Sequence, residues 1–367
     1  MTAGDRISHL NSGLMVASLA AAYLIPFELF LLAYAVLGPL HYLTEISWIH
    51  DRRYFMDGDA SARGRRITRL WLLLVGATLA VMVYGLAAEK LLDGAASPRI
   101  EIGLFYLVLV AAALLVFRSH AFVTAGTLLL TAVGLLLFNS SPYYGLIAFF
   151  IITIVHVLVF TAAFVLLGAL KTRSRAAALS LGIYAACLAC LFLVSPAGGA
   201  VSAFARDSYQ PFEALNAQLI QVLGLGAGTA ARDIYESDAG ATVMRLIAFA
   251  YTYHYLNWFT KTSVIGWAKM PKARAAAIAL LWIAAVAVYA WDYLLGFVLL
   301  YALSVLHVML ELPLNHQSFV GIGRELSGLL RPSRREAEAP APRPKISRKA
   351  TRKARRLRTG GAARRTG

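Results

Sequence analysis

Two histidines in apolar stretches are each followed by a glutamate four residues later. His41 precedes Glu45 in Gly-Pro-Leu-His-Tyr-Leu-Thr-Glu, and His307 precedes Glu311 in Leu-His-Val-Met-Leu-Glu. A spacing of four places both side chains of a pair on one face of a helix. A histidine and a carboxylate presented together can ligate one metal ion, or the carboxylate can orient the imidazole as its hydrogen-bond acceptor.

Two further histidines stand singly in apolar stretches. His156 lies in Ile-Thr-Ile-Val-His-Val-Leu-Val, and His254 lies in Tyr-Thr-Tyr-His-Tyr-Leu-Asn-Trp. The aromatic and amide side chains around His254 favour a polar cavity, in which Tyr253 and Asn257 are candidate cofactor-binding residues. The alternative for these side chains is an aromatic belt at a membrane interface.

Ionisable groups inside apolar spans are costly and usually functional, so the sequence predicts one shared metal site. Imidazole with carboxylate and open coordination positions is the usual setting for non-haem iron and oxygen chemistry. Zinc would instead suit a hydrolase, and haem would need paired axial histidines with room for a macrocycle. Separate structural or proton-relay roles are the remaining alternative. The predicted metal ligands are His41, Glu45, His156, His254, His307 and Glu311.

Known local motifs add little. Cys187 and Cys190 form a Cys-x-x-Cys pattern, but within an apolar span, where two small buried side chains are the better interpretation. The His-x-x-His-His boxes of membrane desaturases and hydroxylases do not occur, and neither does the Pro-His-Gly signature of carotene-cleaving dioxygenases. The expected metal chemistry therefore follows from the ligand types alone.

The composition indicates which elements position these residues. Of 367 residues, 59% are hydrophobic and 15% are charged, and the mean hydropathy is +0.65. A soluble domain has about 45–50% apolar and about 25% charged residues, so a soluble enzyme is excluded. The sequence predicts an all-α, polytopic integral membrane bundle over residues 1–330.

Runs of about 20 apolar residues mark the spans. The region 10–50 is interrupted by Pro26 and by Gly38–Pro39, and we interpret it as one broken span near 12–37 with a helical continuation at 40–50. This gives nine spans, and a hairpin at Pro26 would give ten. The other eight are expected at about 67–92, 100–117, 121–138, 143–170, 176–196, 241–266, 274–291 and 292–312.

The basic residues predict the orientation. Connections rich in Lys and Arg alternate with basic-poor connections at 93–99, 139–142 and 197–240, so one topology satisfies the positive-inside rule. The segment 331–367 carries 14 Lys/Arg and two acids, or +12 of the net +16. We expect it to be a disordered cytoplasmic tail that binds anionic lipid headgroups of the plasma or inner membrane. Nucleic acid is an unlikely partner because no aromatic residues interleave with the charges.

Together these features predict a membrane-embedded, metal-dependent oxidoreductase, with iron as the expected metal. Its substrate would reach the site through the lipid bilayer, as a fatty acyl, isoprenoid or carotenoid chain would. The alternatives are a transporter of protons, ions or small solutes, and a bis-His haem electron-transfer protein. If both His/Glu pairs serve one site, His41 and His307 must lie within about 12 Å of each other, and Glu45 and Glu311 should face each other.

Overall fold

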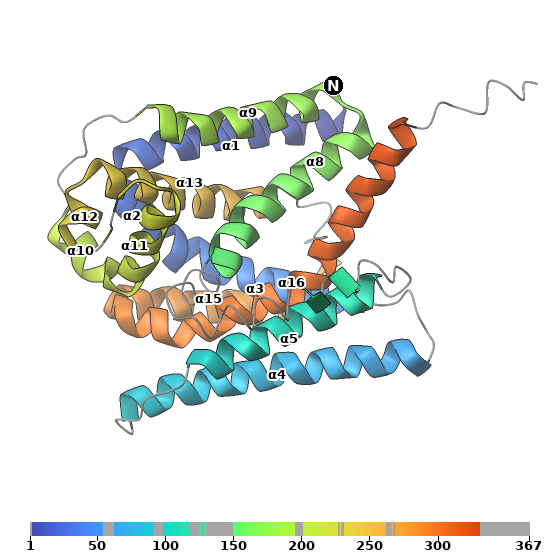
Figure 1. Cartoon of the computed structure of the whole chain (residues 1–367), viewed down its shortest axis with the longest axis horizontal. Helices are drawn as coiled ribbons and strands as arrows, with labels where there is room; N and C mark the ends of the chain where they lie inside the picture. Colours follow the sequence, from blue (N-terminus) through green and yellow to red (C-terminus); the bar gives the residue numbers. More distant parts are fainter. Residues whose placement is uncertain are drawn as a thin grey trace, which may run out of the picture. The chain divides into compact units, whose positions relative to one another are not determined.

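The computed structural model is helical, with no strands among the residues it describes (Figure 1). The chain divides into two compact units, Met1–Glu325 and Leu326–Gly367, and the residues of the site described below belong to the first. The described residues are 2–53, 62–91, 98–117, 125–126, 128–129, 150–194, 201–226, 228, 231–261, 266 and 269–330. The expected span at 121–138 and the predicted tail at 331–367 lie outside these ranges, apart from four residues.

Seven helices within the described ranges are long and apolar enough to cross a bilayer. A shorter apolar helix covers Gly103–Phe117. The seven are Gly4–Leu24, Pro26–Asp51, Gly64–Gly85, Val155–Thr172, Arg175–Leu193, Lys272–Trp291 and Tyr293–Leu329. The all-helical, membrane-like character expected from the composition is thus confirmed, whereas the expected count of nine or ten is not.

The first region differs from its main interpretation as one broken span. The helix α1 (Ala3–Leu24) ends at Ile25, and α2 (Pro26–Leu32) begins a second helix that is itself long enough to cross a bilayer. The expected break at Gly38–Pro39 is wrong. The chain continues from α2 through the π-helical segment η1 (Ala33–Leu37) into α3 (Gly38–Asp51). Pro39 has no backbone N–H to donate, so a π-helical turn before it sacrifices fewer backbone hydrogen bonds than it would elsewhere.

The last span is also longer than expected. It was predicted to end at residue 312, before Pro313, but α16 runs from Tyr293 to Leu330 with this proline inside it. The ring Nδ1 of His316 contacts the Leu312 carbonyl oxygen at 2.6 Å. The helix continues on both sides of Pro313, so Glu311 has a full helical turn on either side.

The helix α13 (Asp238–Thr260) is the element around which the first unit packs. It contacts α1, α2, η1, α3 and the helix α9 (Arg175–Leu193), which itself lies along α1 (Figure 1). Most of its residues are buried. It is not among the seven apolar candidates, because tyrosines and polar side chains such as Arg245 and Asn257 lower its hydropathy. A long helix with many polar side chains is thus held in the interior.

The remaining long helices complete the bundle. The helix α4 (Ala62–Leu91) packs against α5 (Pro98–Phe117), and α15 (Lys272–Trp291) packs against α3 and η1. The π-helical segment η4 (Phe150–Phe160) leads directly into α8 (Thr161–Thr172), and α8 packs against α9. These elements surround the buried polar residues described below.

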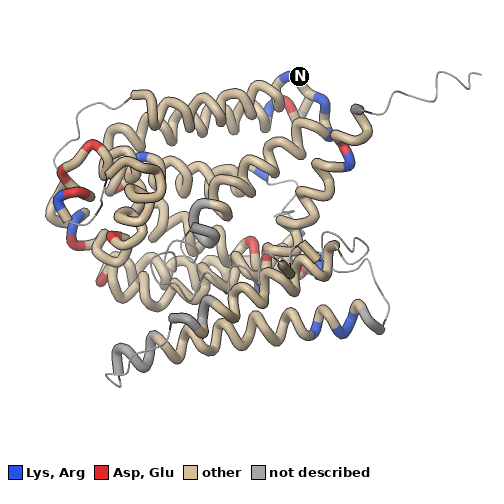
Figure 2. The backbone as a smooth tube through the Cα atoms, viewed as in Figure 1, with Lys and Arg blue, Asp and Glu red and all other residues tan. Residues whose placement is uncertain are grey.

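Charged residues gather at the two ends of these helices, and the middle has few (Figure 2). The end at which α1, α4, α9 and α15 begin carries Arg6, Arg66, Arg175, Lys272 and Arg274 near the first residues of these helices, and we call it the basic end. The other end is covered by short helices with charges of both signs: α10 (Ala203–Tyr209), η5 (Gln210–Phe212), α11 (Glu213–Val222) and α12 (Ala231–Tyr235).

The helix α11 lies within the basic-poor connection at 197–240. It is tied to α12 by the Tyr235 hydroxyl, which donates to Glu213 Oε1 at 2.7 Å. Burial, together with this hydrogen bond, raises the pKa of Tyr235 above its ordinary range. The hydroxyl therefore keeps its proton and continues to donate to Glu213.

Candidate metal centre

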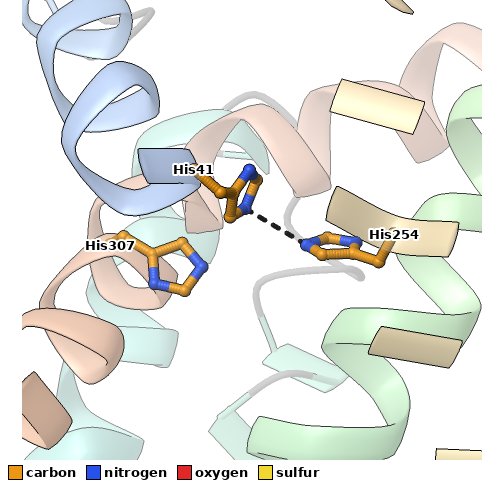
Figure 3. A group of neighbouring side chains, drawn as sticks. All are labelled: His41, His254 and His307. Atoms are coloured by element: carbon orange, nitrogen blue, oxygen red, sulfur yellow. Dashed lines mark hydrogen bonds between the residues drawn. The ribbon is translucent and has the colours of Figure 1, made fainter. Parts of the chain in front are cut away.

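The four histidines from apolar stretches come together in one buried group. His41 lies on α3, His156 on η4, His254 on α13 and His307 on α16. Their ring centroids form a closed circuit: His41 to His254 at 4.9 Å, His254 to His156 at 5.0 Å, His156 to His307 at 5.1 Å, and His307 to His41 at 5.2 Å. All four are at most 8% exposed. Figure 3 shows three of these rings turned toward one another from three helices.

The ring nitrogens face the centre of this circuit. Nε2 of His41 is 3.2 Å from Nε2 of His254, and Nε2 of His307 is 3.3 Å from Nε2 of His156. One ligand atom each of His41, His254 and His307 lies within 4.8 Å of the other two. Two imidazole nitrogens bound to one metal at ~2.0–2.1 Å would be roughly 3.0–3.4 Å apart. The observed separations match those of neighbouring ligands to one ion.

Local helix geometry brings two of these rings to the centre. His156 is in η4, and His41 follows η1 by four residues. A π-helical turn contains more residues than an α-helical turn, so it rotates the following side chains around the helix axis, and such segments are frequent at functional sites. The apolar runs around these histidines contain no feature by which the sequence revealed either segment.

The two glutamates occupy different positions relative to the rings. Glu45 Oε2 is 3.0 Å from Nε2 of His41, the same nitrogen that faces His254. Glu311 Oε2 is 3.3 Å from Nδ1 of His156, the nitrogen on the other side of that ring from His307. Glu45 therefore borders the space between the imidazoles, whereas Glu311 holds one imidazole from behind.

The two carboxyl groups also interact with each other, as expected for a shared site. Both residues are at most 3% exposed. Within the described part of the chain, Oε2 of each glutamate has no hydrogen-bond partner. Two buried carboxylates in contact repel each other unless a proton or a cation lies between them. The donor set thus fits a metal ion, which would compensate the two negative charges.

A hydroxyl and three aromatic side chains complete the walls of the group. Thr161 Oγ1 is 2.8 Å from Nδ1 of His254, so it fixes the ring from the side opposite to His41. Tyr42 stacks on His307 with a centroid separation of 4.2 Å, and its hydroxyl is 2.7 Å from that of Tyr255. The Trp258 indole donates to Thr44 Oγ1 at 3.0 Å.

A glycine allows this tyrosine pair to approach the backbone. A Cβ at Gly38 would lie 3.1 Å from the Tyr42 hydroxyl and 3.3 Å from the Tyr255 hydroxyl. Both separations are tighter than ordinary van der Waals contacts. The absence of a side chain at this position therefore lets the tyrosine pair pack beneath η1, which closes the side of the group away from the basic end.

A cavity of about 670 Å³ extends from the group toward the basic end. His41, Glu45, His254 and Glu311 line its buried part, together with Asn257. Apolar side chains form much of its wall, including Trp48, Leu115, Phe164, Leu167 and Leu314. Its volume lies within the range of pockets that bind small molecules.

The other residues singled out from the sequence lie as follows. Asn257 lines the cavity, but Tyr253 does not, and its ring stacks with Phe249 at 6.1 Å and packs against Tyr184 at 5.7 Å. These neighbours belong to an aromatic and aliphatic core. Tyr253 follows the apolar face of α13 because adjacent helical residues point about 100° apart. Cys187 lies in the same core, in keeping with a packing role.

Sequence analysis missed Thr161 and Lys261 as members of the site. Thr161 is five residues after His156, a spacing that carries no signal in an α-helix, and η4 lies between them. Lys261 caps α13 and lines the cavity with its cation 5.2 Å from the Phe164 ring centroid. A lysine at the end of an apolar span normally indicates only the membrane boundary.

The fold and the site define an all-helical protein with seven candidate membrane spans, whose interior holds four histidines and two glutamates in contact. Comparison with protein-family models, curated proteins and solved structures gave no match.

Proposed function

We propose that this protein is a membrane-embedded, metal-dependent oxidoreductase that acts on a lipid-soluble chain. The observation that carries the proposal is a pair of ligand-like Nε2 separations, His41 to His254 at 3.2 Å and His156 to His307 at 3.3 Å, beside the Glu45 carboxylate, with ligand atoms of His41, His254 and His307 within 4.8 Å of one another. The proposed ligands are the four histidines and Glu45, and Glu311 and Thr161 would hold His156 and His254 in their orientations.

Iron is the metal best suited to this donor set. Several imidazoles with a carboxylate are typical of non-haem iron centres that keep a coordination position open for oxygen or substrate. The cavity reaches Glu45, His41 and His254, so an exogenous ligand has access to one side of the group. A fatty acyl, isoprenoid or carotenoid chain would enter such a cavity along its apolar wall.

The proposed roles of the chain's own residues follow from their positions. The histidines would hold the metal in their neutral form, and the contacts of Glu311 and Thr161 would fix each ring's tautomer and direction. The paired side chains of Tyr42 and Tyr255, which do not line the cavity, would exclude water from the side of the group away from it. When bound, the metal would supply activation of an oxidant.

The geometry favours this function over the two alternatives. A bis-His haem places a porphyrin plane between two axial imidazoles, and Nε2 separations of 3.2 and 3.3 Å leave no space for one. A transporter needs a path to both ends of the bundle. Among the described residues, the lining of the cavity extends to the basic end, and aromatic side chains including Tyr34, Phe212 and Tyr251 fill the core toward the other end.

Metal analysis of detergent-purified protein tests the proposal. We expect about one iron per chain by mass spectrometry in the native protein, and less than ~0.2 per chain in His254→Ala. His316→Ala is the matched control, because His316 lies outside the histidine group and contacts the Leu312 carbonyl oxygen and the Phe117 ring. Native protein with less than ~0.2 metal per chain, unchanged by His254→Ala, would refute the proposed function.

The proposed localisation is an integral protein of the plasma or inner membrane, with the basic end and the segment 331–367 facing the cytoplasm. The segment would bind anionic lipid headgroups. A green fluorescent protein fused after residue 367 folds only on the cytoplasmic side of the inner membrane, so fluorescence is expected. A dark but intact fusion would place the basic end on the outer side.

A further inference from the structure

The cavity beside the histidine group has an uneven distribution of charge. Among the described residues that line it, the cations are Lys261, Lys171 and Arg324, and the acids are the buried Glu45 and Glu311. Burial decreases in the order from the glutamates to Lys261, which is partly buried, and then to Lys171 and Arg324, which are exposed. The cavity therefore runs from a buried group with ligand-type donors to a cationic mouth at the basic end.

The depth of the cavity follows from helix geometry. Thirteen residues of α16 separate Glu311 from Arg324, and ten residues of α8 separate Thr161 from Lys171. At 1.5 Å per residue these are rises of about 20 and 15 Å. Half of a bilayer's hydrocarbon core is also about 15 Å thick. A lipid chain with its head at the mouth would thus place its middle or far carbons at the histidine group.

We propose that the substrate is a single-chain amphiphile with an anionic head, a carboxylate or a phosphate, which binds Lys171 and Arg324 while its chain extends inward to the histidine group. The inference rests on the proposed function for the reaction, but not for the binding. Lys261 lies at an intermediate depth, at the end of α13, with its cation against the Phe164 ring. The head group thereby determines which carbons reach the metal.

The mouth is more specific than a general excess of positive charge at one side of a membrane. Arg66 and Arg175 lie at the same basic end and are exposed, yet neither lines the cavity. Lys171 and Arg324 come from α8 and α16, the same two helices that carry Thr161 and Glu311 at the inner end. The two cations and the inner group are therefore placed by the same pair of helices.

Equilibrium binding of three probes to purified protein tests the proposal: tritiated palmitate, hexadecyl phosphate and the neutral hexadecanol. We expect palmitate or hexadecyl phosphate to bind at least tenfold more tightly than hexadecanol, because a hydrogen bond to a charged group has about this effect. The double variant Lys171→Met/Arg324→Met should lose this preference and keep its affinity for hexadecanol. Arg66→Met/Arg175→Met should behave as the native protein. The relative affinities of the two anions identify the head.

Two results would overturn the inference. The first is equal binding of all three probes to the native protein and the double variant. The second is anion binding that survives Lys171→Met/Arg324→Met but is abolished by chelation or His254→Ala, because the head would then bind at the metal. Metal content is measured in the same samples. Charge-dependent binding by a protein without metal would sustain this inference and refute the proposed function.

Discussion

The two His/Glu pairs have the same spacing but different contacts. In α3, Glu45 lies against the Nε2 of its own partner His41. In α16, Glu311 contacts Nδ1 of His156, from another helix, and His307 stacks on Tyr42. A spacing of four places two side chains on one face, but the neighbouring helices decide what each side chain meets. One pattern thus supplies a candidate ligand in one helix and a positioning carboxylate in the other.

The strongest test of this comparison removes the histidine of each pair. His41→Ala and His307→Ala should each reduce bound iron to less than ~0.2 per chain, since both imidazoles belong to the same circuit and loss of one ligand leaves a buried centre incomplete. Elemental mass spectrometry of purified protein measures the effect, and His316→Ala serves as the control. Iron retained in one variant and lost in the other would show that the two pairs serve different sites.

Substitution of the two carboxylates should distinguish the residue that binds the metal from the residue that positions an imidazole. Glu45→Gln removes a charged ligand and should weaken iron binding more than 100-fold, whereas Glu311→Gln keeps a hydrogen-bond acceptor for His156 and should weaken it about tenfold. Chelator competition measures both. Glu28→Gln is the control, because Glu28 accepts from Ser202 away from the group.

The order of these two losses of affinity decides which carboxylate binds the metal. Equal losses in Glu45→Gln and Glu311→Gln would mean that both carboxylates bind the metal directly. A larger loss in Glu311→Gln would reverse the roles inferred from the contacts of the two oxygen atoms with ring nitrogens.

A smaller effect is expected at Thr161. Thr161→Val removes the hydroxyl next to Nδ1 of His254 at nearly constant volume, which should weaken iron binding several-fold by loosening the ring's orientation. Thr161→Ser should restore it, because the hydroxyl returns. An affinity in Thr161→Val equal to the native value would show that the ring is held by packing alone.

The smallest expected effect is at Tyr42. Tyr42→Phe keeps the ring stacked on His307 and removes only the hydroxyl paired with Tyr255, so iron binding should change by less than about twofold. Loss of the buried hydrogen bond should lower the free energy of unfolding by about 1 kcal/mol. Thermal denaturation in detergent, with iron content measured in parallel, separates the two effects. A large loss of iron would assign the hydroxyl to the centre itself.

Some of this site followed from the sequence. Histidines in four different apolar spans have few partners for their ring nitrogens in lipid. Their contact with one another is the arrangement that the sequence predicted. The membrane-like, all-helical fold followed from composition in the same way. Asn257 lines the cavity beside the group, whereas Tyr253, the residue before His254, lies in the apolar core, because adjacent residues of a helix point about 100° apart.

The sequence by itself determined that the chain is helical and membrane-like and that its costly polar residues are few enough to serve one centre. Both conclusions depend on residue types and on the spacing of apolar side chains along the sequence, which are local properties of the chain. The tertiary structure decided that η1 and η4 turn His41 and His156 inward and that α16 continues through Pro313. It also decided that Glu311 contacts His156 from another helix and not His307 from its own. These depend on which helices face each other, and side-chain periodicity contains no information about the partner across the interface.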